Sequence, residues 1–202
     1  KRYNAPANRA DSATAVASDA NGNVVVTGAS RSDSNGDGLY DNDYYTAKYA
    51  AADGALLWEQ RYNGLLAFGD IACAVAVDPA GNVVVTGSSG GYYTAKYAAS
   101  DGALLWSKQY TGPGVGGDSA SAVAVDGSGN VVVTGSSVSG APAQDFDYYT
   151  AKYAAADGAL LWGKRYNGPA NGDDRARAVA VDAAGNVVVT GSSYDTPSAF
   201  DS

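Results

Sequence analysis

The sequence contains no histidine and only one cysteine among its 202 residues. Without histidine, the commonest general base and the commonest transition-metal ligand are missing, which argues against triad hydrolysis and zinc catalysis. One cysteine allows no internal disulfide and no soft-metal cluster. We interpret Cys73, within Ile-Ala-Cys-Ala-Val-Ala-Val, as a small residue of a β-strand rather than a reactive thiol.

Basic residues are also scarce, with 13 Lys and Arg against 21 Asp and Glu and a formal net charge of −8. Nucleic-acid binding needs clustered basic residues, so no nucleic-acid partner is expected. The sequence has no long apolar run, which argues against membrane insertion. It has neither a signal peptide nor an initiating Met, and residue 1 falls within a repeat unit, so we expect an internal piece of a longer chain.

The composition is otherwise that of a folded chain, with 46% hydrophobic and 17% charged residues. The apolar residues are mainly Ala, Val, Tyr and Leu, with only three Phe and no Met, and there are 26 Gly. Abundant glycine favours turns over long helices, and valine and tyrosine favour strands. The composition therefore predicts β structure.

One block, Gly-Asn-Val-Val-Val-Thr-Gly, recurs without change at residues 22–28, 81–87, 129–135 and 185–191. It belongs to a longer repeat unit with four short segments, which we call strands a, b, c and d. Each segment is rich in β-branched or aromatic residues and is bounded by Gly, Asn or Asp, as strands are. In the first complete unit the segments are residues 15–19, 24–27, 44–49 and 56–62.

Short antiparallel strands in a repeated unit predict an all-β fold, a β-propeller built of four-stranded antiparallel blades, of which about four are visible. A linear β-solenoid is the alternative, although its rungs are usually shorter. We expect residues 1–202 to form a single propeller domain or segment. Its units cover approximately residues 1–6 (strand d only), 15–62, 74–110, 122–166 and 178–202 (strands a and b only).

The unit resembles a known family. The run Ala-Val-Ala-Val-Asp-x-x-Gly-Asn-Val-Val-Val-Thr-Gly-Ser-Ser, then Tyr-Thr-Ala-Lys-Tyr and Asp-Gly-Ala-Leu-Leu-Trp, is similar to the bacterial β-propeller repeat called SBBP. The resemblance covers essentially the whole chain. It implies a propeller of about seven blades in a large secreted or surface protein, and it implies no activity and no catalytic residues.

The two ends of a blade differ in how much they vary between units. The a–b and c–d turns have constant length, whereas the loop between strands b and c is long in the first and third units and short in the second. The crossing from strand d to the next strand a has constant length but a changing sequence. Because binding sites favour variable loops on a rigid frame, we expect function at the end with these loops.

One long loop has the pattern of a calcium site: Asp33-Ser-Asn35-Gly-Asp37-Gly38-Leu39-Tyr-Asp41. Oxygen-bearing side chains at alternate positions, with a glycine for the sharp turn, can surround a hard cation. A Tyr stands where an EF-hand has its bidentate Glu, and the loop instead looks like the calcium loops of integrin-type (FG-GAP) propeller repeats. The proposed ligands are Asp33, Asn35, Asp37, the carbonyl of Leu39, and Asp41.

Other residues recur once per unit. An aspartate precedes strand a, and we expect it to tie the crossing to a backbone N–H, although a ring of such residues at the channel mouth could bind a cation or a basic partner. The strand-c lysines are expected to lay their stems over the blade with their heads in solvent. The strand-c tyrosines are expected to pack between blades, or to bind sugar if exposed. These residues are Asp11, Asp70, Asp118 and Asp174; Lys48, Lys96 and Lys152; and Tyr44 and Tyr45 with their copies.

The sequence therefore predicts a calcium-stabilised structural or interaction module, secreted or at a bacterial cell surface, and not an enzyme. Its partner would be another protein or further copies of itself, joined through the incomplete terminal units, whose unpaired strands can recruit other chains. The first alternative is a carbohydrate-binding module. The second is a propeller hydrolase or lyase that uses paired carboxylates such as Asp173 and Asp174.

Overall fold

The computed structural model describes residues 10–32, 41–64, 69–141 and 145–194. All regular secondary structure in these residues is β. Three four-stranded antiparallel sheets precede one two-stranded sheet, and within each sheet the strands lie side by side in chain order. Each sheet is one repeat unit, so the described residues form three complete units and the first half of a fourth.

The strands follow the order a, b, c, d in every complete unit. The first sheet consists of β1 (Asp11–Ser18), β2 (Val24–Ser32), β3 (Asp41–Tyr49) and β4 (Leu56–Tyr62). The second consists of β5 (Ile71–Val77), β6 (Val83–Ser88), β7 (Tyr92–Tyr97) and β8 (Leu104–Tyr110). The third consists of β9 (Ser119–Val125), β10 (Val131–Val138), β11 (Phe146–Tyr153) and β12 (Leu160–Tyr166). The last sheet consists of β13 (Arg175–Val181) and β14 (Val187–Ser192).

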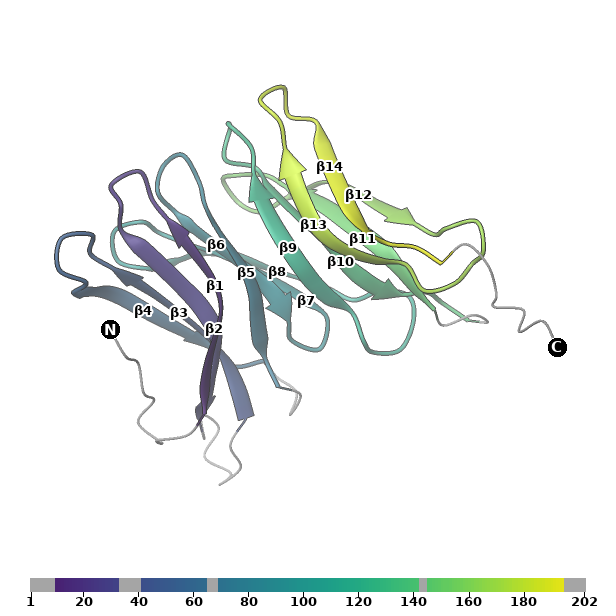
Figure 1. The fold of residues 1–202 in the computed structure, drawn as a ribbon, viewed down its shortest axis with the longest axis horizontal. Coiled ribbons are helices and arrows are strands. Elements are labelled where there is room, and N and C mark those ends of the chain that lie inside the picture. The colour runs from purple at the N-terminus through teal and green to yellow at the C-terminus, as the bar shows by residue number, and fades with distance from the viewer. Residues whose placement is uncertain (1–9, 33–40, 65–68, 142–144, 195–202) are drawn as a thin grey trace.

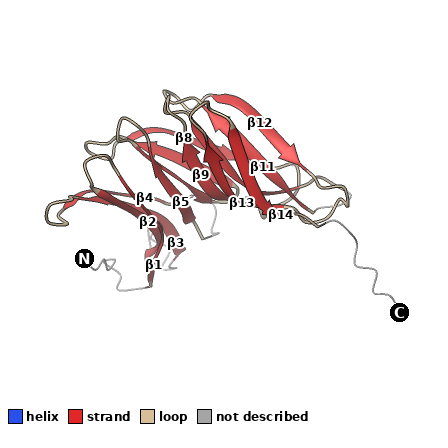
Figure 2. Ribbon diagram, turned by 45° about the horizontal axis from the view of Figure 1, so that its top comes forward, coloured by secondary structure: helices blue, strands red, loops and turns tan. Residues whose placement is uncertain are grey.

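The sheets stand next to one another in chain order, as Figures 1 and 2 show. The first strands of successive sheets contact each other in series, β1 with β5, β5 with β9, and β9 with β13. The opposite edges are formed by β4, β8 and β12. Four-stranded antiparallel sheets with their first strands gathered on the inner side are propeller blades. The predicted β-propeller fold, with about four blades visible, is confirmed.

Strand a is longer than the sequence predicts, because β1 begins at Asp11 and not at Ala15. A β-bulge between Ala13 and Ala15 interrupts the pairing with β2. Thr14, at the bulge, reaches the second sheet, where its hydroxyl donates a hydrogen bond of 2.5 Å to the carbonyl of Ala72. A bulge breaks the alternation of side chains, so the first half of the strand has no period-two signal in the sequence.

Cys73 occupies the same bulge position in β5. It is half-buried, and burial raises the pKa of its thiol. A thiol with a raised pKa is a weak nucleophile at neutral pH. This environment supports the interpretation of Cys73 as a small residue of a strand.

The repeated block forms the a–b turn and most of strand b, and its second copy is residues 81–87. Gly81 lies in the turn with φ of 82°, which glycine adopts without strain. The three valines that follow are completely buried. At the far end, a Cβ on Gly87 would lie 2.1 Å from the carbonyl oxygen of Ile71 and 2.8 Å from the hydroxyl of Tyr44. Packing therefore accounts for the identity of the copies.

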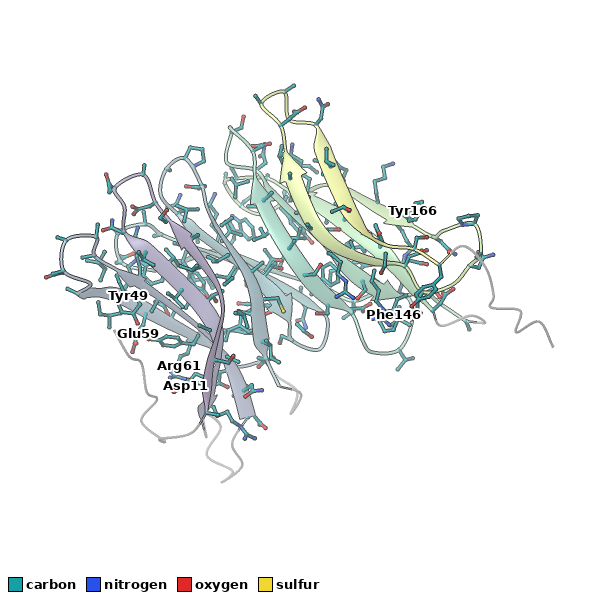
Figure 3. The ribbon with its side chains drawn as sticks, in the orientation of Figure 1. Asp11, Tyr49, Glu59, Arg61, Phe146 and Tyr166 are labelled. Carbon is teal, nitrogen blue, oxygen red and sulfur yellow. The ribbon has the colours of Figure 1, made fainter. Side chains whose placement is uncertain are left out.

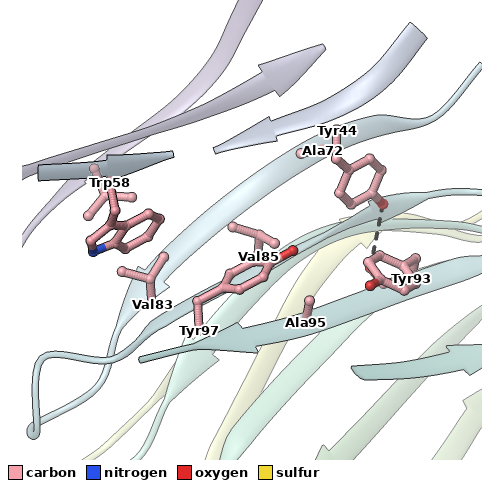
Figure 4. Close-up of a cluster of buried hydrophobic side chains, with 9 residues drawn as sticks. Tyr44, Trp58, Ala72, Val83, Val85, Tyr93, Ala95 and Tyr97 are labelled. Carbon is pink, nitrogen blue, oxygen red and sulfur yellow. Dashed lines mark hydrogen bonds between the residues drawn. The ribbon is translucent and has the colours of Figure 1, made fainter. Parts of the chain in front are cut away.

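Aromatic side chains hold consecutive sheets together (Figure 4). Tyr62 stacks on Tyr93 of the next sheet, with ring centroids 3.7 Å apart and an interplanar angle of 8°. Tyr44 meets both rings edge-on and donates its hydroxyl hydrogen to the Tyr93 carbonyl. Trp58 packs against Tyr97. The predicted packing of the tyrosines between blades is confirmed. The same contacts recur one sheet further on, in Tyr92, Trp106, Tyr110, Tyr149 and Tyr153.

One end of the sheets carries the a–b and c–d turns, and we call it the turn end. There Lys48 joins the first sheet to the second, and Lys96 joins the second to the third. Lys96 Nζ lies 2.8 Å from Asp78 Oδ2 and donates to the carbonyl of Ala155 in the next sheet. Asp78 also accepts the N–H groups of Ala80 and Asn82 in its own turn. The Lys96 side chain is only 3% exposed, because the next sheet covers it, so the prediction of lysine heads in solvent is wrong. The equivalent pairs are Lys48 with Asp19 and Lys152 with Asp126.

These contacts lower the pKa of the aspartates in the a–b turns, which are Asp19, Asp78 and Asp126. Burial would raise the pKa of Asp19, but hydrogen bonds from Lys48 and Asn23 outweigh it and lower the pKa to about 2. The same balance lowers the pKa of Asp126 to about 2 and that of Asp78 below its ordinary value. A carboxylate with a lowered pKa in the folded state stabilises the fold above its ordinary pKa of ~3.9. That contribution is lost as the pH falls toward ~2.

Replacing Gly87 with Ala is expected to lower the free energy of unfolding by about 3 kcal/mol, because the new Cβ would overlap the Ile71 backbone. The matched control is Gly127→Ala, since a Cβ on Gly127 would meet nothing within 4 Å. Urea unfolding of both variants measures the difference. Equal stability of the two variants would contradict the packing explanation for the repeated glycine.

Replacing Lys96 with Met is expected to lower the free energy of unfolding by about 3 kcal/mol or more at pH 7, since Asp78 would keep a buried, unpaired charge. Lys152→Met is the control and should cost less, because the Lys152 side chain is 13% exposed. Urea unfolding from pH 7 to pH 2 checks both. The wild type should lose stability between about pH 4 and pH 2, and Lys96→Met should lose less over that interval. A larger acid loss in the variant would refute this explanation.

Candidate functional site

The opposite end of the sheets, which we call the loop end, carries the b–c loops and the d-to-a crossings. It is the end where the units differ from one another in length and sequence. The b–c loop is long in the first and third units, whereas in the second unit β6 and β7 are joined through Gly90 and Gly91. The candidate functional site is therefore built from residues at the ends of β2, β4, β10 and β12 and at the starts of β3 and β11.

The aspartate before strand a anchors each crossing. Asp70 Oδ2 accepts the N–H of Gly64 at 2.5 Å, and Asp118 Oδ2 accepts the N–H of Gly112 at 2.6 Å. Asp174 is buried and accepts the N–H of Gly168 in the same way. This confirms that these aspartates tie the crossing loop to backbone N–H groups. The remaining member, Asp11, accepts a hydrogen bond of 2.7 Å from Ser30 Oγ.

An aspartate at the start of strand c faces an arginine at the end of strand d in the two units with long loops. Asp147 Oδ2 lies 2.7 Å from Arg165, and Asp43 Oδ2 lies 3.9 Å from Arg61. Both aspartates are buried, whereas the arginine side chains are 27% and 29% exposed. Figure 3 places Arg61 near Asp11 at the loop end of the first sheet. These arginines therefore neutralise carboxylates at the start of strand c, a few residues after each long loop in the sequence.

The second unit, with its short loop, lacks both charges. Gly91 stands where the other units have the aspartate, and Gln109 replaces the arginine. Gln109 Nε2 donates to the carbonyl of Ser89 at 2.9 Å, just as Arg165 donates to the carbonyl of Ser137 at 3.1 Å. The neutral amide therefore keeps the structural hydrogen bond. The charge pair accompanies the long loop and is absent with the short one.

Arg165 is the most extensively bonded of these residues. Its guanidinium also donates to Ser137 Oγ at 2.7 Å and to the hydroxyl of Tyr110, which belongs to the preceding sheet. Burial raises the pKa of Asp147 despite the opposing effect of Arg165, and the charges of Asp145 and Asp174 raise it further. The sequence analysis did not identify this network. Comparing the units position by position would have shown that aspartate and arginine appear together.

The predicted calcium loop meets the described residues at one point. Asp41 is the first residue of β3 and pairs with Ser32. The other proposed ligands, Asp33, Asn35, Asp37 and Leu39, lie outside the described residues. Among the residues that the structure describes, no group of three His, Cys, Asp or Glu side chains could hold a metal ion. A cation here would need ligands from the loop itself, and calcium binding stays a prediction.

Asp41 and Asp43, at the start of β3, form an acidic cluster with Asp70 of the crossing. The backbone N–H of Asp70 donates to the carbonyl of Asn42 at 2.7 Å, which joins the crossing to the start of β3. Burial raises the pKa of Asp70 against hydrogen bonds from Ser89 and Gly64, and the charges of Asp43 and Asp41 raise it further. Arg61 offsets the charge of Asp43, and a cation bound in the loop would offset the negative charge that remains.

The carboxylates of Asp173 and Asp174, the pair considered for catalysis, lie in different environments. Asp173 is 42% exposed, pairs with Arg175 at 3.0 Å and accepts the N–H of Phe146. Asp174 is buried and holds the N–H of Gly168. The Arg175 guanidinium lies 3.7 Å from the centre of the Phe146 ring, which Figure 3 places near the loop end of the third sheet. These contacts bind the crossing to the third sheet and direct the two carboxylates to different partners.

No protein-family model matches the sequence, and no curated protein matches it. Solved structures that are similar in fold include the following two. A protein of unknown function from Bacteroides caccae aligns with a TM-score of 0.52 and 15% identity, over 88% of this chain and 52% of that protein. BamB from Moraxella catarrhalis, a β-propeller, aligns with a TM-score of 0.50 and 16% identity, over 92% of this chain and 55% of that protein.

The chain thus spans about half the length of each of these two proteins. At these identities the likeness concerns the fold, and it agrees with an array of propeller blades. The resemblance of the repeat to SBBP and of one loop to the integrin-type calcium loops stays a prediction. The described part of the chain contains no helix that is long and apolar enough to cross a membrane.

Proposed function

We propose that this chain is a structural and interaction module, a rigid array of blades that presents variable loops to a protein partner without catalysing a reaction. The observation that carries the proposal is the difference between the two ends of the sheets. At the turn end the same aspartate, asparagine and lysine contacts recur from unit to unit. At the loop end both the loop length and the charge below it change. A constant frame with variable loops is the usual basis of a binding surface.

The partner would contact the loops between strands b and c rather than a ring of aspartates. Asp70, Asp118 and Asp174 are at most 4% exposed, and their carboxylates accept backbone N–H groups. They are therefore not available at the channel mouth. The net charge of −8 favours a partner with a basic surface. Further copies of this chain would instead have to use the two ends of the array.

Calcium would bind in the long loop of the first unit. The proposed ligands are those given by the sequence: Asp33, Asn35, Asp37, the Leu39 carbonyl and Asp41. The support from the described residues is that the carboxylates of Asp41 and Asp43, which follow the loop in sequence, lie near enough to Asp70 for their charges to act on it. Millimolar calcium is an extracellular condition, so a calcium-dependent module agrees with a secreted or surface-attached protein.

The two alternative functions receive less support. Two of the strand-c tyrosines considered for sugar binding, Tyr44 and Tyr92, are buried between sheets and only 1% exposed. The acidic pair proposed for hydrolysis is divided between a partly exposed Asp173 and a buried Asp174 with separate partners. We therefore favour the interaction module over both the carbohydrate-binding module and the enzyme.

Calcium at millimolar concentration is expected to raise the melting temperature by about 5 °C or more, if it is present at roughly 100 times its dissociation constant. The Asp37→Ala variant should lose this shift. Asp145→Ala, which removes a carboxylate near the other long loop, is the control and should keep it. Calorimetry with calcium, with magnesium and with a chelator measures the effect. A wild type that does not respond to calcium, or an equal response in Asp37→Ala, would contradict the calcium site.

Exchange of one loop tests the interaction surface. Residues 29–43 are replaced by Ser-Ser-Gly-Gly, the sequence of residues 88–91, together with Arg61→Gln. The splice is compatible with the sheet because Ala29 pairs with Tyr44 as Ser88 pairs with Tyr92. The matched control makes the same exchange in the third unit, at residues 136–147, with Arg165→Gln.

Both proteins with an exchanged loop are expected to stay folded. At least one of them should fail to capture a protein partner that the wild type binds. The measurement is quantitative affinity capture at two salt concentrations, with circular dichroism as the check of folding. Partners that are captured equally by the wild type and by both folded variants would show that the b–c loops are not the binding surface.

A further inference from the structure

The half-complete fourth unit leaves an open strand edge and a hollow beside it. β14 pairs with β13 on one side, and among the described residues no strand pairs with its other side. In every complete sheet that side of strand b is occupied by strand c. A cavity of about 560 Å³ lies along this edge, between β14 and the face of β12. Its lining includes Tyr148, Trp162, Tyr166 and Thr190.

The equivalent space between complete sheets is filled by two tyrosines of strand c. Between the first two sheets, Tyr93 stacks on Tyr62 and Tyr97 packs against Trp58. The counterparts of Tyr62 and Trp58 in the third sheet are Tyr166 and Trp162. Tyr166 is 49% exposed and is labelled in Figure 3 at the end of the array. The cavity therefore corresponds to the space that a Tyr-Tyr-x-x-x-Tyr strand occupies elsewhere in the molecule.

Polar groups around the cavity match the same missing strand. Asp182 accepts the N–H groups of Ala184 and Asn186 in its turn, as its equivalents do, but no lysine among the described residues pairs with it. The equivalent of Thr190 in the second sheet, Thr86, shares a hydrogen bond of 2.8 Å with Thr94 of strand c. A lysine and a threonine at the spacing of Tyr-Tyr-Thr-Ala-Lys-Tyr would satisfy both positions.

The third sheet also presents groups that contact the next sheet elsewhere. Lys96 Nζ and Trp106 Nε1 both donate to the carbonyl of Ala155, in the c–d turn of the following unit. For their counterparts Lys152 and Trp162, no such carbonyl is among the described residues. The missing element thus includes a c–d turn as well as strand c.

We propose that β14 and the exposed face of β12 form a docking site for a strand of the type Tyr-Tyr-Thr-Ala-Lys-Tyr, supplied as a c–d hairpin of a further unit of this repeat. The strand adds to the edge of β14 by main-chain hydrogen bonds. Its second tyrosine stacks on Tyr166, its last tyrosine packs on Trp162, and its lysine pairs with Asp182. The hairpin turn supplies the carbonyl for Lys152 and Trp162.

A second copy of these 202 residues is a poor source of that hairpin. Each of β3, β7 and β11 is already hydrogen-bonded on both sides, to strand b and to strand d of its own sheet. A copy that donated one of them would have to open a complete blade. The occupant is therefore a repeat hairpin other than the three that the described sheets already use.

The test uses a fluorescein-labelled peptide with the sequence of residues 146–166, the hairpin of the third unit, titrated with the full chain. We expect saturable binding, measured by anisotropy. Tyr166→Ala should weaken it at least tenfold, about 1.4 kcal/mol, by removing the stacked ring. The matched control is Leu105→Ala on β8, a residue that is also about half exposed (48%). It should leave the affinity unchanged.

A double-mutant cycle identifies the ion pair. Asp182→Asn in the protein and a peptide with Met in place of its lysine should each weaken binding about fivefold. The two changes together should weaken it little more than either one, because each removes the same pair. Hydrogen exchange should show new protection at the amides of β14, and the same method verifies that the variants stay folded.

Three results would overturn the proposal. The first is a folded protein with no measurable binding of the peptide. The second is binding that Tyr166→Ala leaves unchanged and Tyr45→Ala abolishes, which would place the peptide on the outer face of the first sheet. The third is concentration-dependent association of the chain with itself that requires Tyr166 and that the peptide does not inhibit. That outcome would make a second copy the occupant.

Discussion

The buried lysine ammonium group at the turn end is the interaction on which the arrangement of the sheets depends. Lys96 bonds to the aspartate of its own turn and to a carbonyl of the next sheet, and that carbonyl also accepts the Trp106 indole N–H. A buried charge is tolerated only when its bonds are complete, so the position of one sheet relative to the next is fixed by this contact. The aspartate, the asparagine, the lysine and the tryptophan must then all be present in each unit. This requirement explains why the complete units are so similar at the turn end.

Much of the fold follows from the sequence because its determinants are local. Turn glycines, short runs of valine and tyrosine, and the constant turn lengths identify four strands per unit without reference to any other part of the chain. The buried lysines could not be predicted in this way, since a unit considered alone leaves the Lys96 head uncovered. Its second partner, Ala155, lies in the following unit and is brought near only by stacking. The bulge at Thr14 was missed for a similar reason, because its hydroxyl bonds to Ala72 of the second sheet.

The sequence predicted where the candidate site lies, but not the ion pairs and hydrogen bonds within it. Repetition indicated which end varies and that Asp70 and its equivalents anchor the crossings. The pairing of Asp147 with Arg165 joins strands c and d across the sheet and also reaches a tyrosine of the preceding sheet. Such a network cannot be inferred from the spacing within one segment. The loop with most of the proposed calcium ligands falls outside the described residues, so its coordination depends on the sequence pattern alone.

The identical Val-Val-Val segments have very different surroundings along the array. In β6 and β10 all three valines are fully buried, whereas Val24 is 37% exposed in β2 and Val188 is 63% exposed in β14. Since each sheet contacts only its neighbours, local stability behaves as a nearest-neighbour sum. Among the described sheets of this chain, local opening should therefore be easier in the first and the last than in the two between them. Resistance to opening then depends on the neighbours of a unit rather than on its residues, and the same seven-residue sequence is buried in one sheet and partly exposed in another.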